Sequence, residues 1–288
     1  MIAKIKKAVS YFTAAEIILW AVSVLLITSS FFIFARREYL TLAASLVGVT
    51  ALIFCAKGNP AGQALMILFS AMYGVISFTF AYYGEMMTYL GMSAPMAVFS
   101  LVSWLRNPYE GKRSEVKVSA LGAAETVCIF VLSAVVTLVF YFILGALGTA
   151  NLLPSTLSVT TSFLAVCLTF RRSPYYAAAY AANDVVLVIL WVTASLSDAS
   201  YVSVAVCFAV FLANDIYGFI SWSRMKKRQE HGAQPSVKKT GSVNFTDPVF
   251  FVSFALSEQI LYVHYNGKDH RLALRLRIQI LREIVLHV

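Results

Sequence analysis

The sequence contains few charged residues. Only 13% of its 288 residues are charged, whereas 59% are hydrophobic; a typical soluble domain is about 25% charged and 45–50% apolar. These proportions predict a membrane protein and argue against both a soluble enzyme and a disordered chain. The net charge is +9, but the basic residues occupy short loops between apolar runs and form no continuous stripe. We therefore expect no nucleic-acid partner.

The sequence also lacks patterns typical of metal or haem binding. Each of the four cysteines stands alone inside an apolar run, as expected of small buried residues; they are Cys55, Cys128, Cys167 and Cys207. All four histidines lie beyond residue 228, so the apolar runs offer no imidazole for haem, zinc or a proton relay. We expect no cofactor, no metal and no histidine-based intramembrane enzyme.

What the sequence does have is long apolar runs, and about 20 such residues suffice for a helix to cross a bilayer. The runs lie near 15–34, 38–56, 62–81, 87–106, 121–147, 152–170, 176–195 and 201–222. They predict an all-α polytopic membrane protein with eight transmembrane helices. The first run follows three lysines, but it is too long for a signal peptide and lacks a cleavage site, so we expect a retained helix.

The loop charges predict an orientation. Fourteen Lys and Arg residues lie at the N-terminus and in the loops that follow even-numbered runs, against only Arg36 and Arg37 on the other side. Because cytoplasmic loops carry the excess of Lys and Arg, we expect both ends of the bundle to face the cytoplasm.

The second half of the chain repeats the first weakly. A shift of 118 residues places Ser103-Trp104-Leu105-Arg106 on Ser221-Trp222-Ser223-Arg224. The shift predicts two parallel three-helix repeats, 38–106 and 152–222, joined by a linker helix at 121–147 and preceded by one extra helix. Parallel repeats are a transporter architecture, with the substrate site at the repeat interface.

Polar residues recur inside three of the runs. Helical spacing places Tyr180, Asn183, Asp184 and Trp191 on one face of the seventh run, together with Leu187. On the eighth run Asn214 and Tyr217 share a face with Asp215 beside it, and Gln63 belongs to a polar stripe of the third. Amides, hydroxyls and aromatic rings suit a neutral or mildly cationic ligand that has a flat ring and several hydroxyls.

Each of these residues also has a structural interpretation. Asp184 and Asp215 could instead form hydrogen bonds between helices, and Trp104 and Trp222, next to arginines, are better explained as interfacial anchors than as ligand contacts. Residues Glu16 and Glu125 lie near helix starts, where they would compensate the helix dipole or lie at the interface. Pro95 predicts a kink, which could be a hinge or a packing feature.

Two segments resemble a known family over roughly residues 10–230. The stretch Asn214-Asp215-Ile216-Tyr217-Gly218-Phe219-Ile220-Ser221-Trp222-Ser223-Arg224 resembles the last-helix signature of PnuC-type nicotinamide riboside transporters. The stretch Trp104-Leu105-Arg106-Asn107-Pro108-Tyr109-Glu110-Gly111 is similar to the loop before their linker helix. The resemblance implies a SWEET-like three-plus-one-plus-three core in the bacterial inner membrane and a homotrimer.

The function implied by the resemblance is facilitated diffusion of nicotinamide riboside, with trapping by a cytoplasmic nucleoside kinase. The family's ligand contacts would fall on Asn183, Asn214 and Tyr217, and also on Gln63, Trp191 and Asp184. Close relatives carry thiamine or riboflavin, which are therefore alternative substrates. A membrane-embedded sensor or enzyme that uses the same polar faces is a further alternative.

The C-terminal part departs from this family. We expect a transmembrane domain over 1–228, a polar linker over 229–247 and a small cytoplasmic segment over 248–288. Asn266-Gly267 lies between two runs of alternating polarity and is a strong signal for a hairpin turn. The segment could be an appended module or an aberrant reading frame, and the sequence assigns it no function.

Overall fold

The computed structural model describes residues 11–79, 86–149 and 151–232, and within them eight helices are long and apolar enough to cross a membrane. The spans contain the helices α2 (Ala14–Phe34), α3 (Tyr39–Ala56), α4 (Pro60–Thr79), α6 (Ala94–Arg106), α7 (Ala123–Ala146), α8 (Leu152–Phe170), α9 (Tyr176–Ser195) and α10 (Val202–Gly232). The eight-helix prediction is confirmed. The predicted hairpin around residues 258–280 lies outside the described residues.

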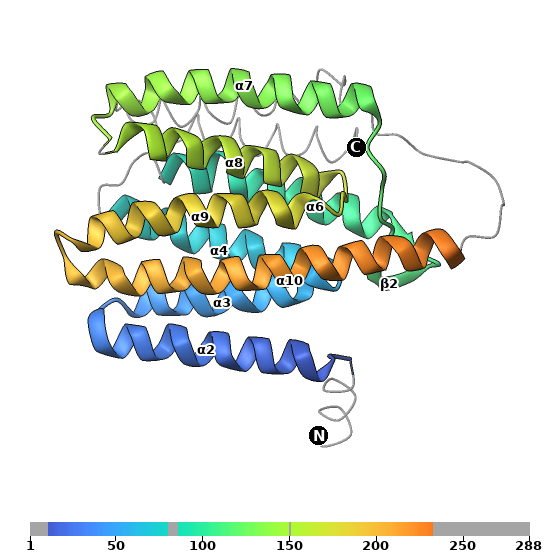
Figure 1. The fold of residues 1–288 in the computed structure, drawn as a ribbon, viewed down its shortest axis with the longest axis horizontal. Coiled ribbons are helices and arrows are strands. Elements are labelled where there is room, and N and C mark those ends of the chain that lie inside the picture. The colour runs from blue at the N-terminus through green and yellow to red at the C-terminus, as the bar shows by residue number, and fades with distance from the viewer. Residues whose placement is uncertain (1–10, 80–85, 150, 233–288) are drawn as a thin grey trace, which may run out of the picture.

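Six of these helices, which Figure 1 shows from the side, form a closed ring. The helices α3, α4 and α6 pack in sequence, as do α8, α9 and α10. The ring closes because the first helix of each group packs against the last helix of the other, α3 against α10 and α8 against α6. Outside the ring, α2 covers α3 and α10, and α7 lies along α8. The ring leaves an interior that all six helices can line.

The fourth span combines a π-helix, η1 (Met87–Ser93), with α6. Pro95 lies in the first turn of α6, directly after η1. Proline has no backbone N–H to donate to the preceding turn and its ring crowds that turn, and a π-helical turn is one recognised way to relieve such a conflict. The irregularity of this span is a π-helix directly before the turn that contains Pro95.

A short hairpin holds the extended end of α10. Strands β1 (Pro108–Tyr109) and β2 (Lys112–Val116) pair antiparallel, and both residues of the turn between them have positive φ. Gln229 of α10 accepts a hydrogen bond from the amide of Val118 and donates one to the carbonyl of Val116. These contacts explain why α10 continues beyond the predicted span end at 222, so residues 229–232 are helical rather than part of a linker.

Trp104 and Trp222 are fully buried in the ring, so their interpretation as interfacial anchors is wrong. Their exposed fractions are 1% and 0%, and the two rings pack 5.3 Å apart. The indole of Trp104 donates to the carbonyl of Thr169 at the end of α8, and that of Trp222 donates to the carbonyl of Cys55 at the end of α3. Each indole is thus a second donor to a last-turn carbonyl, which also accepts from a backbone amide just beyond its helix, that of Gly58 for Cys55 and that of Arg172 for Thr169.

The serines that precede the two tryptophans, Ser103 and Ser221, also donate hydrogen bonds to the other group of helices. Ser103 donates to the carbonyl of Phe170, and Ser221 donates to the carbonyl of Ala56. The last helix of each group is therefore bonded to the end of the first helix of the other group. The side chains of Trp104 and Trp222, together with Tyr176 of α9, form a layer that we call the tryptophan layer. Tyr176 packs edge-on against both indoles.

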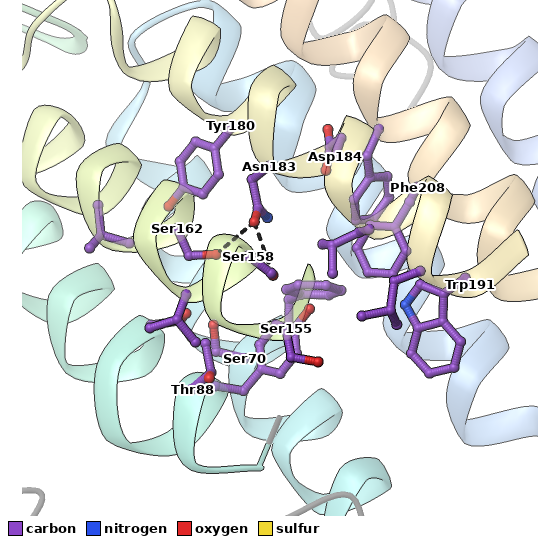
Figure 2. Close-up of a pocket in the computed structure, with 18 of the residues that line it drawn as sticks. Ser70, Thr88, Ser155, Ser158, Ser162, Tyr180, Asn183, Asp184, Trp191 and Phe208 are labelled. Atoms are coloured by element: carbon purple, nitrogen blue, oxygen red, sulfur yellow. Dashed lines mark hydrogen bonds between the residues drawn. The ribbon is translucent and has the colours of Figure 1, made fainter. Parts of the chain in front are cut away.

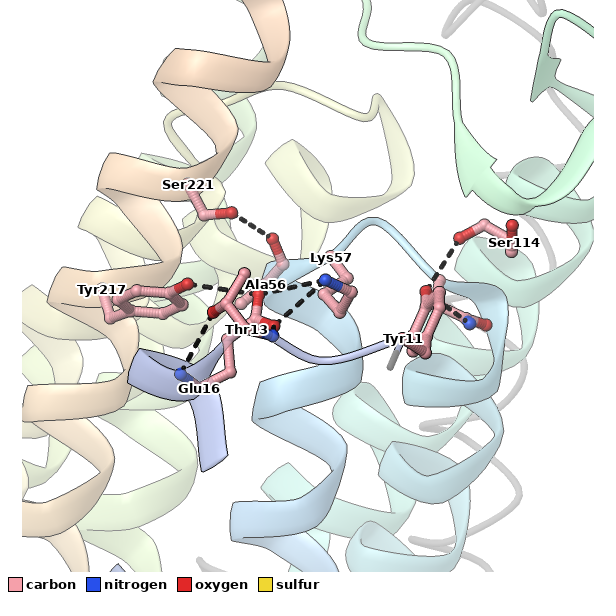
Figure 3. A network of polar contacts seen from close by, with 9 residues as sticks. Tyr11, Thr13, Glu16, Ala56, Lys57, Ser114, Tyr217 and Ser221 are labelled. Carbon is pink, nitrogen blue, oxygen red and sulfur yellow. Dashed lines mark hydrogen bonds and ion pairs between the residues drawn. The ribbon is translucent and has the colours of Figure 1, made fainter. Parts of the chain in front are cut away.

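The two outer helices begin alike. Glu16 in the first turn of α2 forms an ion pair with Lys57, which follows α3; the Oε2 and Nζ atoms are 3.1 Å apart. Glu125 in the first turn of α7 pairs with Arg171, which follows α8, at 2.6 Å. Both carboxylates therefore lie where the helix dipole favours a negative charge, as the sequence predicted. Figure 3 shows Glu16 between Lys57, Thr13 and Tyr217.

Candidate functional site: a polar cavity inside the six-helix ring

A cavity of about 690 Å³ occupies the interior of the ring. This volume lies within the usual range of small-molecule sites. At one end the cavity reaches Cys55, Thr169 and Tyr176, next to the tryptophan layer, and at the other it reaches the helix connections at Gly148 and Ser197. Its long axis therefore follows the helices, from the tryptophan layer to the opposite end of the bundle.

Asn183 lines the cavity and is held by three hydrogen bonds (Figure 2). Hydroxyls of α8 donate to its Oδ1, those of Ser158 and Ser162 at 3.2 and 3.1 Å and that of Thr161 at 2.9 Å. This arrangement fixes the side-chain amide and leaves its Nδ2 donors for a ligand. An amide held in place before binding loses little freedom when a ligand arrives.

Two carboxyl groups also line the cavity. Asp184 of α9 and Asp215 of α10 are each 4% exposed, and their side chains are in hydrogen-bond contact with one another. A hydrogen bond between two carboxyl groups requires a shared proton. The Oδ2 atom of Asp184 is buried and has no hydrogen-bond partner within the described chain.

Aromatic side chains supply the flat surfaces. Trp191 and Tyr180 of α9 lie on the cavity wall, and Figure 2 shows them on either side of Asn183 and Asp184. Phe208 of α10 and Tyr89 of η1 complete the wall. Planar rings of this kind can stack on a heteroaromatic ligand and can hold a positive charge over their faces.

The α9 face predicted from helical spacing is the face that lines the cavity. Tyr180, Asn183, Asp184, Leu187 and Trp191 all belong to the lining. Gln63 of α4 lines it as well, with its Nε2 3.3 Å from the sulfur of Cys55, and Asp215 of α10 completes the set. Six of the eight predicted site residues are thus brought together.

Asn214 and Tyr217 are the two predicted site residues that do not line the cavity. This corrects the expectation from the sequence that they contact the ligand. Asn214 donates to the hydroxyl of Ser23 in α2 at 3.0 Å and to the carbonyl of Val210 at 2.8 Å. Tyr217 donates to Glu16 of α2 at 3.1 Å (Figure 3). Because α2 packs along the outside of α10, the polar face that carries both residues turns away from the cavity.

The sequence analysis missed the hydroxyl row of α8. Ser155, Ser158 and Ser162 line the cavity, and their i, i+3, i+7 spacing places them on one helix face. That periodicity was available in the sequence, but hydroxyl side chains are common in membrane helices, where they bond to their own backbone. The role of Ser158 and Ser162 as the support of Asn183 depends on which helix lies opposite.

The lining of the cavity has no basic side chain and, in the described part of the chain, no metal-binding cluster. Aspartates, amides, hydroxyls and aromatic rings make up its polar groups, and no Lys, Arg or His from the described residues reaches it. Such a site can hold a polar ligand by hydrogen bonds and stacking. Eight apolar helices around a polar cavity define the class of the protein, a multi-pass membrane transporter.

Comparisons with known proteins give the family. The model of the nicotinamide mononucleotide transporter family matches residues 38–224, well over half of the chain. A relative described as nicotinamide riboside transporter PnuC, from Neisseria mucosa, is 25% identical over 213 residues, which cover 73% of this chain and 81% of that protein. The chain belongs to the nicotinamide mononucleotide transporter family.

The fold has a solved counterpart. A structure described as the vitamin B3 transporter PnuC superposes with a TM-score of 0.66 at 23% identity, covering 76% of this chain and 94% of the other. The predicted resemblance to PnuC-type transporters is therefore confirmed in sequence and in fold.

Proposed function

We propose that this protein imports nicotinamide riboside, a precursor of NAD, by facilitated diffusion. The family model is described by the mononucleotide and the Neisseria relative by the riboside. The two ligands differ by one phosphate group, so the charge of the cavity lining discriminates between them.

The observation that carries the choice of the riboside is the lack of any basic side chain among the described residues of the lining. A phosphate dianion carries charge that must be neutralised when it leaves water, and burying it without a partner is prohibitive. Phosphate sites in proteins use Arg, Lys, metal ions or helix N-termini for this purpose. The two aspartates of this cavity would repel the dianion further.

The polar groups present match the rest of the nucleoside. Asn183, with its Oδ1 held by hydroxyls of α8, donates to a carboxamide or ribose oxygen, and Gln63 offers a second amide. Trp191 and Tyr180 offer faces for the ring. Asn214 and Tyr217 are left out of this site because they bond to α2.

The reciprocal contacts support a transport cycle between two repeats. We assign the repeats to residues 38–106 and 152–222, with α7 as linker and α2 as the extra helix. The Trp104 and Trp222 bonds join each repeat to the other and close the ring beside one end of the cavity. Opening that end requires these bonds to break.

The loop charges support a cytoplasmic location for the tryptophan layer, since Lys57, Arg106, Arg171 and Arg224 lie at that end of the helices. In this orientation both ends of the described bundle face the cytoplasm of a bacterial cell, and the protein lies in the inner membrane. A cytoplasmic nucleoside kinase then traps the riboside by phosphorylation. A homotrimer is the assembly that the family resemblance implies.

A calorimetric panel on detergent-purified protein tests the proposal. Nicotinamide riboside should bind, and nicotinamide mononucleotide should bind at least a hundredfold more weakly. Thiamine and riboflavin, the alternative substrates, complete the panel. Comparable affinities for riboside and mononucleotide would contradict the proposal, as would tighter binding of thiamine or riboflavin than of the riboside.

A further inference from the structure

The cavity contains two carboxyl groups in contact and no opposite charge. Asp184 and Asp215 lie on adjacent helices, are each 4% exposed, and share a hydrogen bond. Two carboxyl groups in contact cannot both ionise without strong repulsion, so the pair carries at most one negative charge. A buried charge without a partner is costly, so such groups are normally paired or neutralised.

No described residue supplies the opposite charge. The cavity lining contains no Lys, Arg or His among the residues that the structure describes. The described ion pairs are elsewhere: those of Glu16 and Glu125 lie at the starts of the outer helices, and those of Glu110, Glu115 and Glu230 involve the hairpin and the end of α10.

One carboxylate oxygen points to a ligand directly. The Oδ2 atom of Asp184 is buried and has no hydrogen-bond partner within the described chain, and Asp184 belongs to the cavity lining. If the two aspartates served only to join α9 to α10, their mutual bond would be sufficient and this oxygen would have no function. An unsatisfied acceptor on a residue of the cavity wall calls for an explanation, and a bound ligand that reaches it would supply the missing partner.

We propose that the Asp184–Asp215 pair is the counter-ion of the substrate's positive charge, and so selects cationic over neutral nucleosides. This inference rests on the proposed function, because nicotinamide riboside carries a fixed positive charge on its pyridinium nitrogen. The nearby faces of Trp191 and Tyr180 would add cation–π attraction to the same ring. The pair thereby distinguishes the riboside from neutral riboflavin, although not from thiamine, which is also a cation.

The test compares two ligands that differ in this charge. Dihydronicotinamide riboside has the same ribose and carboxamide, but its reduced ring is neutral. We expect wild-type protein to bind nicotinamide riboside at least tenfold more tightly than the dihydro form, measured by calorimetry on the full chain. A unit charge about 5 Å from its counter-ion in a protein interior is attracted strongly enough for an effect of this size.

Charge-removing variants then assign the effect to the pair. Asp184→Asn and Asp215→Asn keep the size and hydrogen-bonding capacity of the side chain, and each should weaken binding of nicotinamide riboside at least tenfold while changing binding of the dihydro form less than threefold. Asp198→Asn is the matched control, because this aspartate lies outside the cavity, at the start of the 3₁₀-helix η2 (Ala199–Tyr201), and we expect unchanged affinities.

The outcomes separate this inference from the proposed function. If wild-type protein binds neither riboside, the proposed function fails and the inference fails with it. If wild-type protein binds nicotinamide riboside but shows no preference over the dihydro form, only the inference is overturned. Equal losses of both ligands in the two Asn variants would also overturn it, since a merely structural role predicts that result. The wild-type comparison decides the matter even if a variant fails to fold.

Discussion

Replacing Asn183 and Asn214 by leucine, one at a time, tests the assignment of the site most directly. The two asparagines are each followed by aspartate, lie in adjacent helices and are almost fully buried. The structure gives them different surroundings: Asn183 lines the cavity, whereas Asn214 bonds to Ser23 and to its own helix. The same substitution should therefore have opposite consequences at the two positions.

Asn183→Leu should weaken riboside binding about ten- to a hundredfold. The substitution removes the Nδ2 donors and leaves a polar group of the ligand without a partner, which costs about 1–3 kcal/mol. The hydroxyls of Ser158 and Ser162, which donate to Asn183 in the wild-type protein, border the same cavity and can be hydrated. We therefore expect little change in the melting temperature.

Asn214→Leu should leave riboside affinity within threefold of wild type. It removes one hydrogen bond to α2, and interhelical bonds in membranes contribute about 0.6 kcal/mol on average and up to about 1.7 kcal/mol. It also removes the Oδ1 atom of Asn214, a buried acceptor without a hydrogen-bond partner in the described chain, which offsets part of that loss. The net destabilisation should be below about 2 kcal/mol.

Both variants can be measured in detergent with the same two assays, titration calorimetry with nicotinamide riboside and a thermal melt without ligand. The melt confirms that each variant is folded, so that a loss of affinity can be attributed to the site. Normal affinity for Asn183→Leu together with a tenfold loss for Asn214→Leu would refute the assignment, because it would place the binding face of α10 on the side that the structure packs against α2.

Three further predictions concern the ring and the transport step. Trp222→Phe removes one of two donors to the carbonyl of Cys55, which also accepts from the amide of Gly58, and should lower stability by about 0.5–1.5 kcal/mol in a thermal melt; an unchanged melt would show that this bond does not stabilise the ring. Gly62→Ala should lower the melting temperature, since the added Cβ would lie 2.6 Å from the backbone nitrogen of Cys55. Gly91→Ala is the control, because nothing lies within 4 Å of a Cβ at that position. Equal melting temperatures for the two variants would contradict the close approach of α3 and α4. Proteoliposomes without an ion gradient should equilibrate the riboside, and accumulation driven by a sodium or proton gradient alone would exclude facilitated diffusion.

The sequence by itself determined the eight spans and the inward face of α9. A bilayer imposes a length of about 20 apolar residues on each spanning helix, so the spans follow from composition alone. The face of α9 followed from spacing, since Tyr180, Asn183, Asp184 and Trp191 form the one polar stripe on an otherwise apolar helix. When a spanning helix has a single polar face, that face lies toward the protein interior, because exposing it to lipid is costly.

Only the tertiary structure decided which side of α10 lines the cavity. This helix carries polar residues on two neighbouring faces, one with Asp215 and the other with Asn214 and Tyr217, and α2 satisfies the second through Ser23 and Glu16. Spacing within one helix cannot show which neighbour covers each face. The same holds for Trp104 and Trp222, because an indole next to an arginine suits either a bilayer interface or a buried carbonyl, and the choice depends on the end of a helix more than 50 residues away.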